Sequence, residues 1–406
     1  MQTVLMCMGT RPEIIKMAPV YHALRKNDID VEVLHTGQHT DIAWPLYEFF
    51  EIDPAFVITL ERERNSVAHL AALIQDKIDQ VLTAYSFDAV LVHGDTTSAY
   101  AAAQVAFYHQ IPVGHVEAGL RSGDWTDPFP EEHNRRMIAQ LATWHFAPTS
   151  QAAANLVDER VPFGTIFNVG NTVVDAATWS LMRFELLRGE DQPLSSYFDE
   201  VEQIARQQKL VLVTAHRREN WDLGIERVAV AVARLAAKHA DLTFVWPVHP
   251  NPIVRETVER VHTSMEPEVA QRVKLIAPLD YLELLWTLQH AWLVITDSGG
   301  IQEEAASLDT PALVVRKTTE RPELIASGGG ALVGTMVYTI QSHVERLLRQ
   351  PEHYHTMRSA RCAFGDGRAA DRIAFYLKRA LLSGTDRPDT DQAITTAPAP
   401  LYVLAA

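Results

Sequence analysis

Cysteine is scarce, since the 406 residues contain only Cys7 and Cys362. Two cysteines so far apart provide neither a metal-site spacing nor a disulfide framework, so we expect a reducing compartment. The chain also lacks the GxGxxG and GxxxxGK[ST] signatures of dinucleotide and triphosphate loops. We therefore expect no metal ligand set and no nicotinamide cofactor.

Basic residues are also outnumbered, because 36 Lys and Arg stand against 51 Asp and Glu, giving a formal net charge of -15. Binding nucleic acid without sequence preference needs a basic surface, so that partner is not expected. Local Arg, Lys and helix N-termini can still bind an anion at short range. No apolar run approaches the roughly 18 residues of a membrane span, and the first residues resemble a strand more than a signal peptide. We expect a cytoplasmic protein that binds neither nucleic acid nor membrane.

Short β-branched runs alternate with segments rich in Ala, Val and Leu at helical spacing, such as 98–109 and 224–239. The first set of predicted strands covers 3–8, 31–36, 89–93, 113–116 and 144–147. The second set covers 210–214, 243–248, 273–276, 292–296 and 312–315. This alternation is typical of α/β proteins, in which helices cover both faces of a parallel sheet.

A mostly helical stretch, 172–208, with a polar loop at 189–196, separates the two sets of strands. We predict two Rossmann-like domains, over 1–171 and 172–366, that face each other across an active-site cleft. A final helix at about 367–382 is expected to cross back to the first domain. Residues 383–406 lack periodicity and are expected to form a flexible tail.

The unusual polar clusters follow predicted strands. They occupy residues 9–11, 94–97, 117–121, 216–220, 249–252 and 297–300. In open parallel sheets, ligands bind outside the carboxyl ends of the strands. Six clusters in such positions predict a ligand site.

Ser298-Gly299-Gly300 precedes a predicted helix at 301–307. Two glycines let the backbone approach a phosphate, and the free N–H groups of the first helical turn would bind it. A plain tight turn with an N-cap is the other interpretation. Glu304, one turn later, either binds both hydroxyls of a ribose or is a favourable charge in the first turn.

Five further side chains are candidates for an anion site. Arg11 and Lys16 flank a helix start, where they either neutralise a diphosphate or are solvated. His216 is either a core histidine or, beside Arg217, part of an anion site. His249 either contacts the ligand or anchors its loop.

Three carboxylates are candidate acid–base groups. Asp95 and Glu117 end apolar strands, where an unpaired charge would be costly, so a functional role is favoured. Glu131 begins a predicted helix, where acidic residues are also common because of the helix dipole.

These residues together resemble the non-hydrolysing UDP-N-acetylglucosamine 2-epimerases, whose fold is that of the GT-B glycosyltransferases. The matching stretches are GTRPEIIKMAPV (9–20), HGDTTSAYAAA (93–103), PVGHVEAGLRSGD (112–124), PFPEEHNRR (128–136), NVGNTVVDA (168–176), TAHRREN (214–220), TDSGGIQEEA (296–305) and TTERPE (318–323). They run in order along most of the chain.

The resemblance implies specific roles for the candidate residues. The UDP contacts would involve Arg11, His216, Ser298, Gly299, Gly300 and Glu304, with Lys16 and Arg321 nearby. Arg217 and the backbone near Ile276 are further candidates for substrate binding. The acid–base or sugar-side groups would be Asp95, Glu117 and Glu131, with His216 assisting at the leaving diphosphate. Family members eliminate UDP, hold 2-acetamidoglucal and add UDP back, so that UDP-N-acetylglucosamine and UDP-N-acetylmannosamine interconvert. The resemblance also implies a homodimer and a product used for surface polysaccharide.

Three other functions share part of this pattern. A GT-B glycosyltransferase would need an acceptor groove, a hydrolysing epimerase would release N-acetylmannosamine, and a UDP-sugar sensor would lack the carboxylates. Leu279 and Leu284 depart from the family pattern, because many bacterial members carry Gln and Phe at these uracil-side positions.

Some members also have a second, activating nucleotide-sugar site. The residues matching it are Gln38, Arg64, Glu131, Arg217 and His249, and all are present. Thr40 stands where Arg is common and Asp41 where Gln or Glu is common. Losing one Arg contact to a diphosphate costs about 1.5–3 kcal/mol, so we expect activation to be weak or absent.

Overall fold

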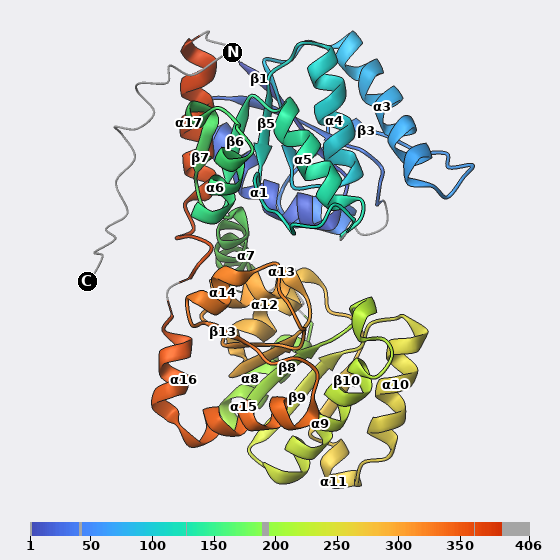
Figure 1. Ribbon diagram of the computed structural model, residues 1–406, viewed down its shortest axis with the longest axis vertical. Coiled ribbons are helices and arrows are strands. Elements are labelled where there is room, and N and C mark those ends of the chain that lie inside the picture. Colours follow the sequence, from blue (N-terminus) through green and yellow to red (C-terminus); the bar gives the residue numbers. More distant parts are fainter. Residues whose placement is uncertain (1, 40–42, 127, 189–194, 361, 384–406) are drawn as a thin grey trace. The chain divides into compact units, whose positions relative to one another are not determined.

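The computed structural model describes residues 2–39, 43–126, 128–188, 195–360 and 362–383 (Figure 1). The chain divides into two compact units. Unit 1 contains Met1–Thr172 and the segment from Gly367 onward, and unit 2 contains Val173–Asp366. Among the described residues, no helix combines the length and apolar character needed to cross a bilayer.

Unit 1 is built on a parallel sheet with the strand order β3-β2-β1-β4-β5-β6-β7. Its strands are β1 (Thr3–Met8), β2 (Asp30–His35), β3 (Phe56–Val57), β4 (Ala89–His93), β5 (Val113–Val116), β6 (Trp144–Ala147) and β7 (Ile166–Asn168). Its helices are α1 (Arg11–Lys26), α2 (Ala43–Phe49), α3 (Val67–Ala84), α4 (Thr97–Tyr108), α5 (Glu131–Leu141), α6 (Ser150–Asp158) and α17 (Ala369–Ser383).

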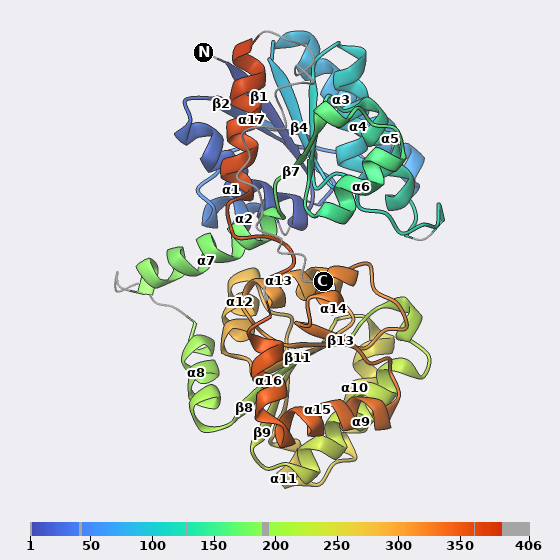
Figure 2. The ribbon, with the colours of Figure 1, turned by 60° about the vertical axis from the view of Figure 1, so that its left-hand side comes forward.

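Both faces of this sheet are buried, as the apolar strands predict. Leu5 and Cys7 of β1 belong to a core cluster with residues of α3 and α4. Val4 and Met6, which alternate with them and therefore point to the other face, are also fully buried. The last helix, α17, packs against α1 (Figures 1 and 2), and Lys378 Nζ donates a 2.7 Å hydrogen bond to the carbonyl oxygen of Asn27.

Unit 2 contains a second parallel sheet with the strand order β10-β9-β8-β11-β12-β13. Its strands are β8 (Lys209–Thr214), β9 (Leu242–Pro247), β10 (Val273–Ile276), β11 (Leu293–Thr296), β12 (Ala312–Val314) and β13 (Gly330–Leu332). Its helices are α7 (Thr172–Arg188), α8 (Tyr197–Gln207), α9 (Gly224–Lys238), α10 (Pro252–Thr263), α11 (Pro267–Ala270), α12 (Tyr281–His290), α13 (Gly299–Ser307), α14 (Pro322–Ala326), α15 (Val337–Arg349) and α16 (Pro351–Arg358).

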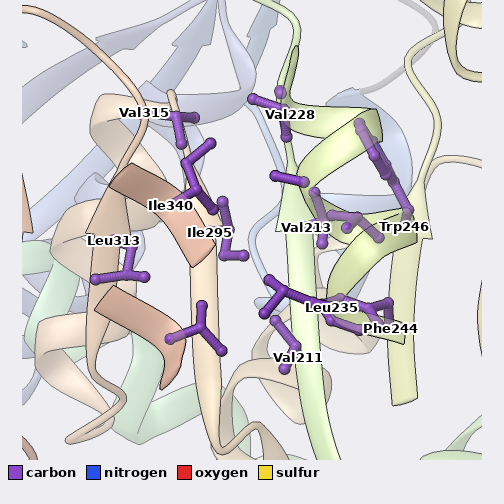
Figure 3. Packing of buried hydrophobic residues seen from close by; sticks show 14 of the residues in the cluster. Val211, Val213, Val228, Leu235, Phe244, Trp246, Ile295, Leu313, Val315 and Ile340 are labelled. Carbon is purple, nitrogen blue, oxygen red and sulfur yellow. The ribbon is translucent and has the colours of Figure 1, made fainter. Parts of the chain in front are cut away.

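The core on one face of the second sheet is shown in Figure 3. Val213 of β8 and Ile295 of β11 lie in one buried cluster with Leu235 of α9 and Ile340 of α15. Large aromatic side chains from β9, such as Trp246, fill the same layer. Burial of this kind of apolar surface is the main favourable contribution to folding.

The predicted α/β class with two parallel sheets is confirmed, and all ten predicted strands are present with ends shifted by at most one residue. Three strands are missing from the prediction: β3, β7 and β13. Each lies at the edge of its sheet and is only two or three residues long. Such short runs carry no periodic pattern, so their pairing depends on the neighbouring strand.

When strands are counted within each unit, the second sheet has the doubly wound order 3-2-1-4-5-6, and the first has the same order with a seventh strand added at the end. The order reverses between β1 and β4 in unit 1, and between β8 and β11 in unit 2. Ligands bind at such switch points in open α/β sheets. The polar clusters after these four strands therefore lie where a ligand site is expected.

Candidate active site

The segment after β1 passes very close to its neighbours at the switch point of unit 1. A β-carbon at Gly9 would lie only 1.8 Å from Thr36 Oγ1 and 2.6 Å from Ser98 Oγ. These two hydroxyl oxygens are themselves 2.6 Å apart, and Ser98 Oγ donates a 2.6 Å hydrogen bond to Gln38 Oε1. Glycine is therefore required at position 9. Gln38 thus lies at the first turn of α4.

Glu13, which the sequence analysis does not single out, ties this segment to the one after β4. It is fully buried, and its Oε2 accepts hydrogen bonds from the backbone N–H groups of Gly9 (2.9 Å) and Thr10 (2.7 Å). Its Oε1 accepts a 2.6 Å hydrogen bond from Thr96 Oγ1. The spacing Thr10-x-x-Glu13, a capping box, was the available sequence signal.

We expect Glu13 to make stability depend on pH. Burial raises its pKa from 4.5 to about 7, although hydrogen bonds from Thr96, Gly9 and Thr10 act in the opposite direction. The folded state therefore binds a proton that the unfolded state has already lost, so the contribution of Glu13 to stability is complete below about pH 4.5 and falls as pH rises towards 7.

Urea unfolding of wild type and Glu13→Gln at several pH values between 4.5 and 8 checks this expectation. The amide can accept from Gly9 and Thr10 through its oxygen, and it does not titrate. Wild type should lose stability relative to Glu13→Gln as pH rises. A difference between the two proteins that stays constant across this range would contradict the expectation.

Glu117 directly follows β5 and is surrounded by polar partners. Lys16 Nζ, from the second turn of α1, forms an ion pair with Glu117 Oε2, and the same oxygen accepts a 3.2 Å hydrogen bond from Asn171 Nδ2. His93 Nε2, at the end of β4, lies 3.8 Å away. The backbone of Glu117 has φ of 63°, which is uncommon for a residue with a side chain and is often found at functional sites.

Asp95 follows β4 and is held by α5. Arg135 forms an ion pair with Asp95 Oδ2, and Asn134 Nδ2 donates a 2.8 Å hydrogen bond to the Asp95 carbonyl oxygen. Glu132, whose side chain is fully buried, binds two arginines of the same helix. Its Oε2 lies 3.3 Å from Arg135 NH1, and its Oε1 lies 2.7 Å from Arg136 Nε. The network orients the Asp95 carboxylate, because each charge is bound by a partner of opposite sign.

The other candidates of unit 1 lie in different positions. Glu131 is the first residue of α5, and Arg11 is the first residue of α1. Arg64 is exposed in the segment between β3 and α3. Thr40 and Asp41, on which the expectation of weak activation depends, lie outside the described residues.

In unit 2, the segment after β8 is held by Asp297, a fully buried residue directly after β11. Its carboxylate accepts hydrogen bonds from the backbone N–H groups of His216 (2.9 Å) and Arg217 (2.9 Å) and from Asn220 Nδ2 (2.9 Å). From the sequence, Asp297 was expected only as a member of the polar cluster at 297–300. The structure shows that it joins the two strands of the switch point.

His216 and His249 are stacked, with ring centroids 5.1 Å apart and ring planes at 8°. Burial lowers the pKa of His216; Asp297 opposes that effect, while His249 and Arg217 add to it. The backbone N–H of Asn251 donates a 3.1 Å hydrogen bond to His249 Nδ1. His249 therefore anchors its loop, as one of the two interpretations expects, and its ring stacks on His216.

The N-terminus of α13 lies among charged side chains. Ser298 is its N-cap residue, and a β-carbon at Gly299 would lie 3.7 Å from Arg217 NH2 and 3.9 Å from Arg321 Cζ. Arg321 also forms an ion pair with the buried Glu303. Free N–H groups at a helix start, together with two guanidinium groups, form an environment that favours an anion.

The remaining candidates of unit 2 surround this helix or end a strand. Gly300 is exposed in the first turn of α13, and Glu304 is buried one turn later. Ile276 ends β10, where its carbonyl oxygen accepts a 2.9 Å hydrogen bond from the N–H of Val248. Among the described residues, no cluster of His, Cys, Asp or Glu has the geometry to hold a metal ion.

Two doubly wound parallel sheets, each with polar residues at its switch point, define an α/β protein with two Rossmann-like domains of the GT-B type. The family profile described as UDP-N-acetylglucosamine 2-epimerase matches residues 22–378. The chain therefore belongs to the UDP-N-acetylglucosamine 2-epimerase family, and it is an isomerase.

Individual relatives agree with this assignment. The UDP-N-acetylglucosamine 2-epimerase of Escherichia coli O157:H7 is 42% identical over 94% of this chain and 99% of its own length. The Neisseria meningitidis UDP-GlcNAc 2-epimerase, whose structure was solved bound to UDP-GlcNAc, is 38% identical to this chain and superposes with a TM-score of 0.83. The match covers 93% of this chain and all of the Neisseria chain. An S. aureus protein, MnaA, solved with UDP, is 36% identical with a TM-score of 0.82, over 96% and 99% of the two chains.

Proposed function

We propose that the protein interconverts UDP-N-acetylglucosamine and UDP-N-acetylmannosamine without net hydrolysis. The observation that carries this proposal is the pair of carboxylates at neighbouring strand ends, Asp95 and Glu117, each oriented by a cation from a helix. Family membership and a relative solved with UDP-GlcNAc support the same substrate. A glycosyltransferase or a sensor would not need this pair of carboxylates.

In the proposed reaction, a base removes the proton at C2 and the electron pair forms the C1–C2 double bond. The bond between C1 and the diphosphate oxygen breaks, which leaves UDP and 2-acetamidoglucal. UDP then adds back to C1 while a proton is delivered to the opposite face of C2. Acid–base groups must reach both faces, so we propose Asp95, Glu117 and Glu131 for these roles.

The diphosphate gains negative charge as it leaves. Arg217, Arg321 and the N-terminal turn of α13 are suited to stabilise that charge because the two guanidinium groups lie beside Gly299 and the Glu303 ion pair holds Arg321 in place. We further propose that Arg11 and His216 contact the diphosphate, that Glu304 binds the ribose, and that backbone groups near Ile276 bind the uracil.

The reaction is expected to exchange the hydrogen at C2 with solvent. In heavy water, product formed from UDP-N-acetylglucosamine should carry deuterium at C2, and NMR should detect no accumulation of free UDP. A product without deuterium would sink the proposed chemistry. Stoichiometric UDP and free N-acetylmannosamine would instead identify a hydrolysing enzyme.

Three finer features stay predictions: a homodimer, a cytoplasmic location, and use of the product for surface polysaccharide. Sedimentation analysis of the purified protein tests the first.

A further inference from the structure

The anion-binding region of unit 2 contains an acid that has no part in the reaction proposed above. Glu320 lies next to Arg321, and its Oε2 is 3.8 Å from Arg217 NH2. A β-carbon at Gly299 would lie 3.5 Å from the same oxygen. The carboxylate therefore lies against the first turn of α13, next to the guanidinium group that would hold a phosphate.

Three arginines surround this carboxylate. Arg316, which is 7% exposed, points its NH1 to within 3.3 Å of Glu320 Oε1, while its Nε donates a 2.6 Å hydrogen bond to Glu219. Burial alone would raise the pKa of Glu320, but Arg217, Arg316 and Arg321 together lower it. The acid is therefore ionised at neutral pH, and the cationic region already contains an anion before any ligand arrives.

We propose that Glu320 competes with the diphosphate of UDP for Arg217 and for the first turn of α13, and so limits the affinity for UDP. This inference rests on the proposed function, which places the diphosphate there. Two anions close to one guanidinium group repel each other, and each weakens the binding of the other. In the proposed reaction UDP leaves C1, adds back and finally departs as part of the product. Limited affinity for UDP suits this cycle, because uniformly tight binding does not raise kcat.

The test is the dissociation constant of UDP, measured by calorimetry on the full chain. Glu320→Gln keeps the size of the side chain and removes its charge. We therefore expect the Kd of UDP to fall about five- to tenfold at low salt. This is the scale of the repulsion between two exposed like charges about 4 Å apart. The gain should shrink at high salt because screening weakens that repulsion. Uridine, which lacks phosphates, should bind both proteins equally.

Two variants complete the design. Glu345→Gln removes a carboxylate of α15 that pairs with Lys238 at 2.7 Å, and α15 lies at the end of unit 2 away from α13 (Figures 1 and 2), so Kd should not change. Glu320→Asp keeps the charge but moves it back by one methylene, so Kd should fall by less than in Glu320→Gln. If Glu320→Gln fails to fold, Glu320→Asp is compared with wild type: a lower Kd for UDP at low salt supports the inference, and an equal or higher Kd overturns it.

The outcomes separate the two proposals. If wild type binds UDP and Glu320→Gln binds it equally or more weakly, Glu320 does not compete with the diphosphate, and the proposed function stands. A gain that is equal for uridine and UDP, or that does not depend on salt, also overturns the inference. If wild type does not bind UDP, the proposed function fails first.

Discussion

Replacing Glu117 with Gln, or Asp95 with Asn, is expected to lower kcat by on the order of 10²-fold or more, the usual scale for acid–base groups. Both substitutions keep the shape of the side chain and remove its ability to exchange a proton. In Glu117→Gln the ion pair with Lys16 becomes at most a hydrogen bond from the Lys16 ammonium to a neutral amide oxygen, and in Asp95→Asn the same happens with the Arg135 guanidinium. The loss should therefore appear in kcat more than in the affinity for UDP.

Steady-state kinetics by NMR, together with calorimetric titration of UDP, measures both quantities. Asp79→Asn is a suitable control. Asp79 is an exposed residue of α3, and its Oδ1 lies 2.7 Å from His109 Nε2. It should leave kcat unchanged. Near-normal turnover in both carboxylate variants would mean that other groups carry out the proton transfer.

Replacing Asp297 with Asn is expected to have the largest effect on stability. The buried carboxylate accepts from three donors, two backbone N–H groups and the Asn220 amide. The variant would direct its own amide N–H group towards one of them and leave that donor unsatisfied. Hydrogen bonds to charged groups are worth about 1.5–3 kcal/mol each, so we expect a loss of about 2–4 kcal/mol of unfolding free energy.

UDP binding should weaken as well, because the segment that carries His216 and Arg217 loses its anchor. Chemical denaturation and calorimetry at one temperature report the two effects. Asp241→Asn serves as the matched control, since Asp241 forms an exposed ion pair with Lys209, and such pairs contribute about 0–1 kcal/mol. If Asp297→Asn is no less stable than this control, the carboxylate is not the anchor that its contacts indicate.

The sequence predicts the position of the candidate site better than its internal contacts. Glu131 was expected at a helix start, and it is the first residue of α5. The two glycines were expected just before a helix at 301–307, whereas α13 begins at Gly299, so both glycines lie in its first turn. Each expectation rests on residues within one or two turns of each other, so local rules of helix capping and strand periodicity suffice.

The roles of Lys16, Asp297 and Glu320 were not predictable in the same way. From the sequence, Lys16 either neutralises a diphosphate or is solvated; in the folded chain it pairs with Glu117, 101 residues away. Asp297 accepts a hydrogen bond from His216, which is 81 residues away in the sequence, and Arg135 binds Asp95, which is 40 residues away. No local pattern encodes such pairs.

The sequence by itself determined the α/β class, the two sets of parallel strands and the polar residues at the strand ends, because apolar periodicity and turn residues act over a few positions along the chain. Only the tertiary structure decided which partner each buried polar side chain binds. Strand order brings β1 beside β4 and β8 beside β11, and a buried carboxylate such as Glu13 or Asp297 then binds whichever donors the neighbouring strand end supplies. A buried carboxyl group without hydrogen-bond partners would be too costly to keep, so the partners are fixed by the packing of the sheet and not only by the sequence near each residue.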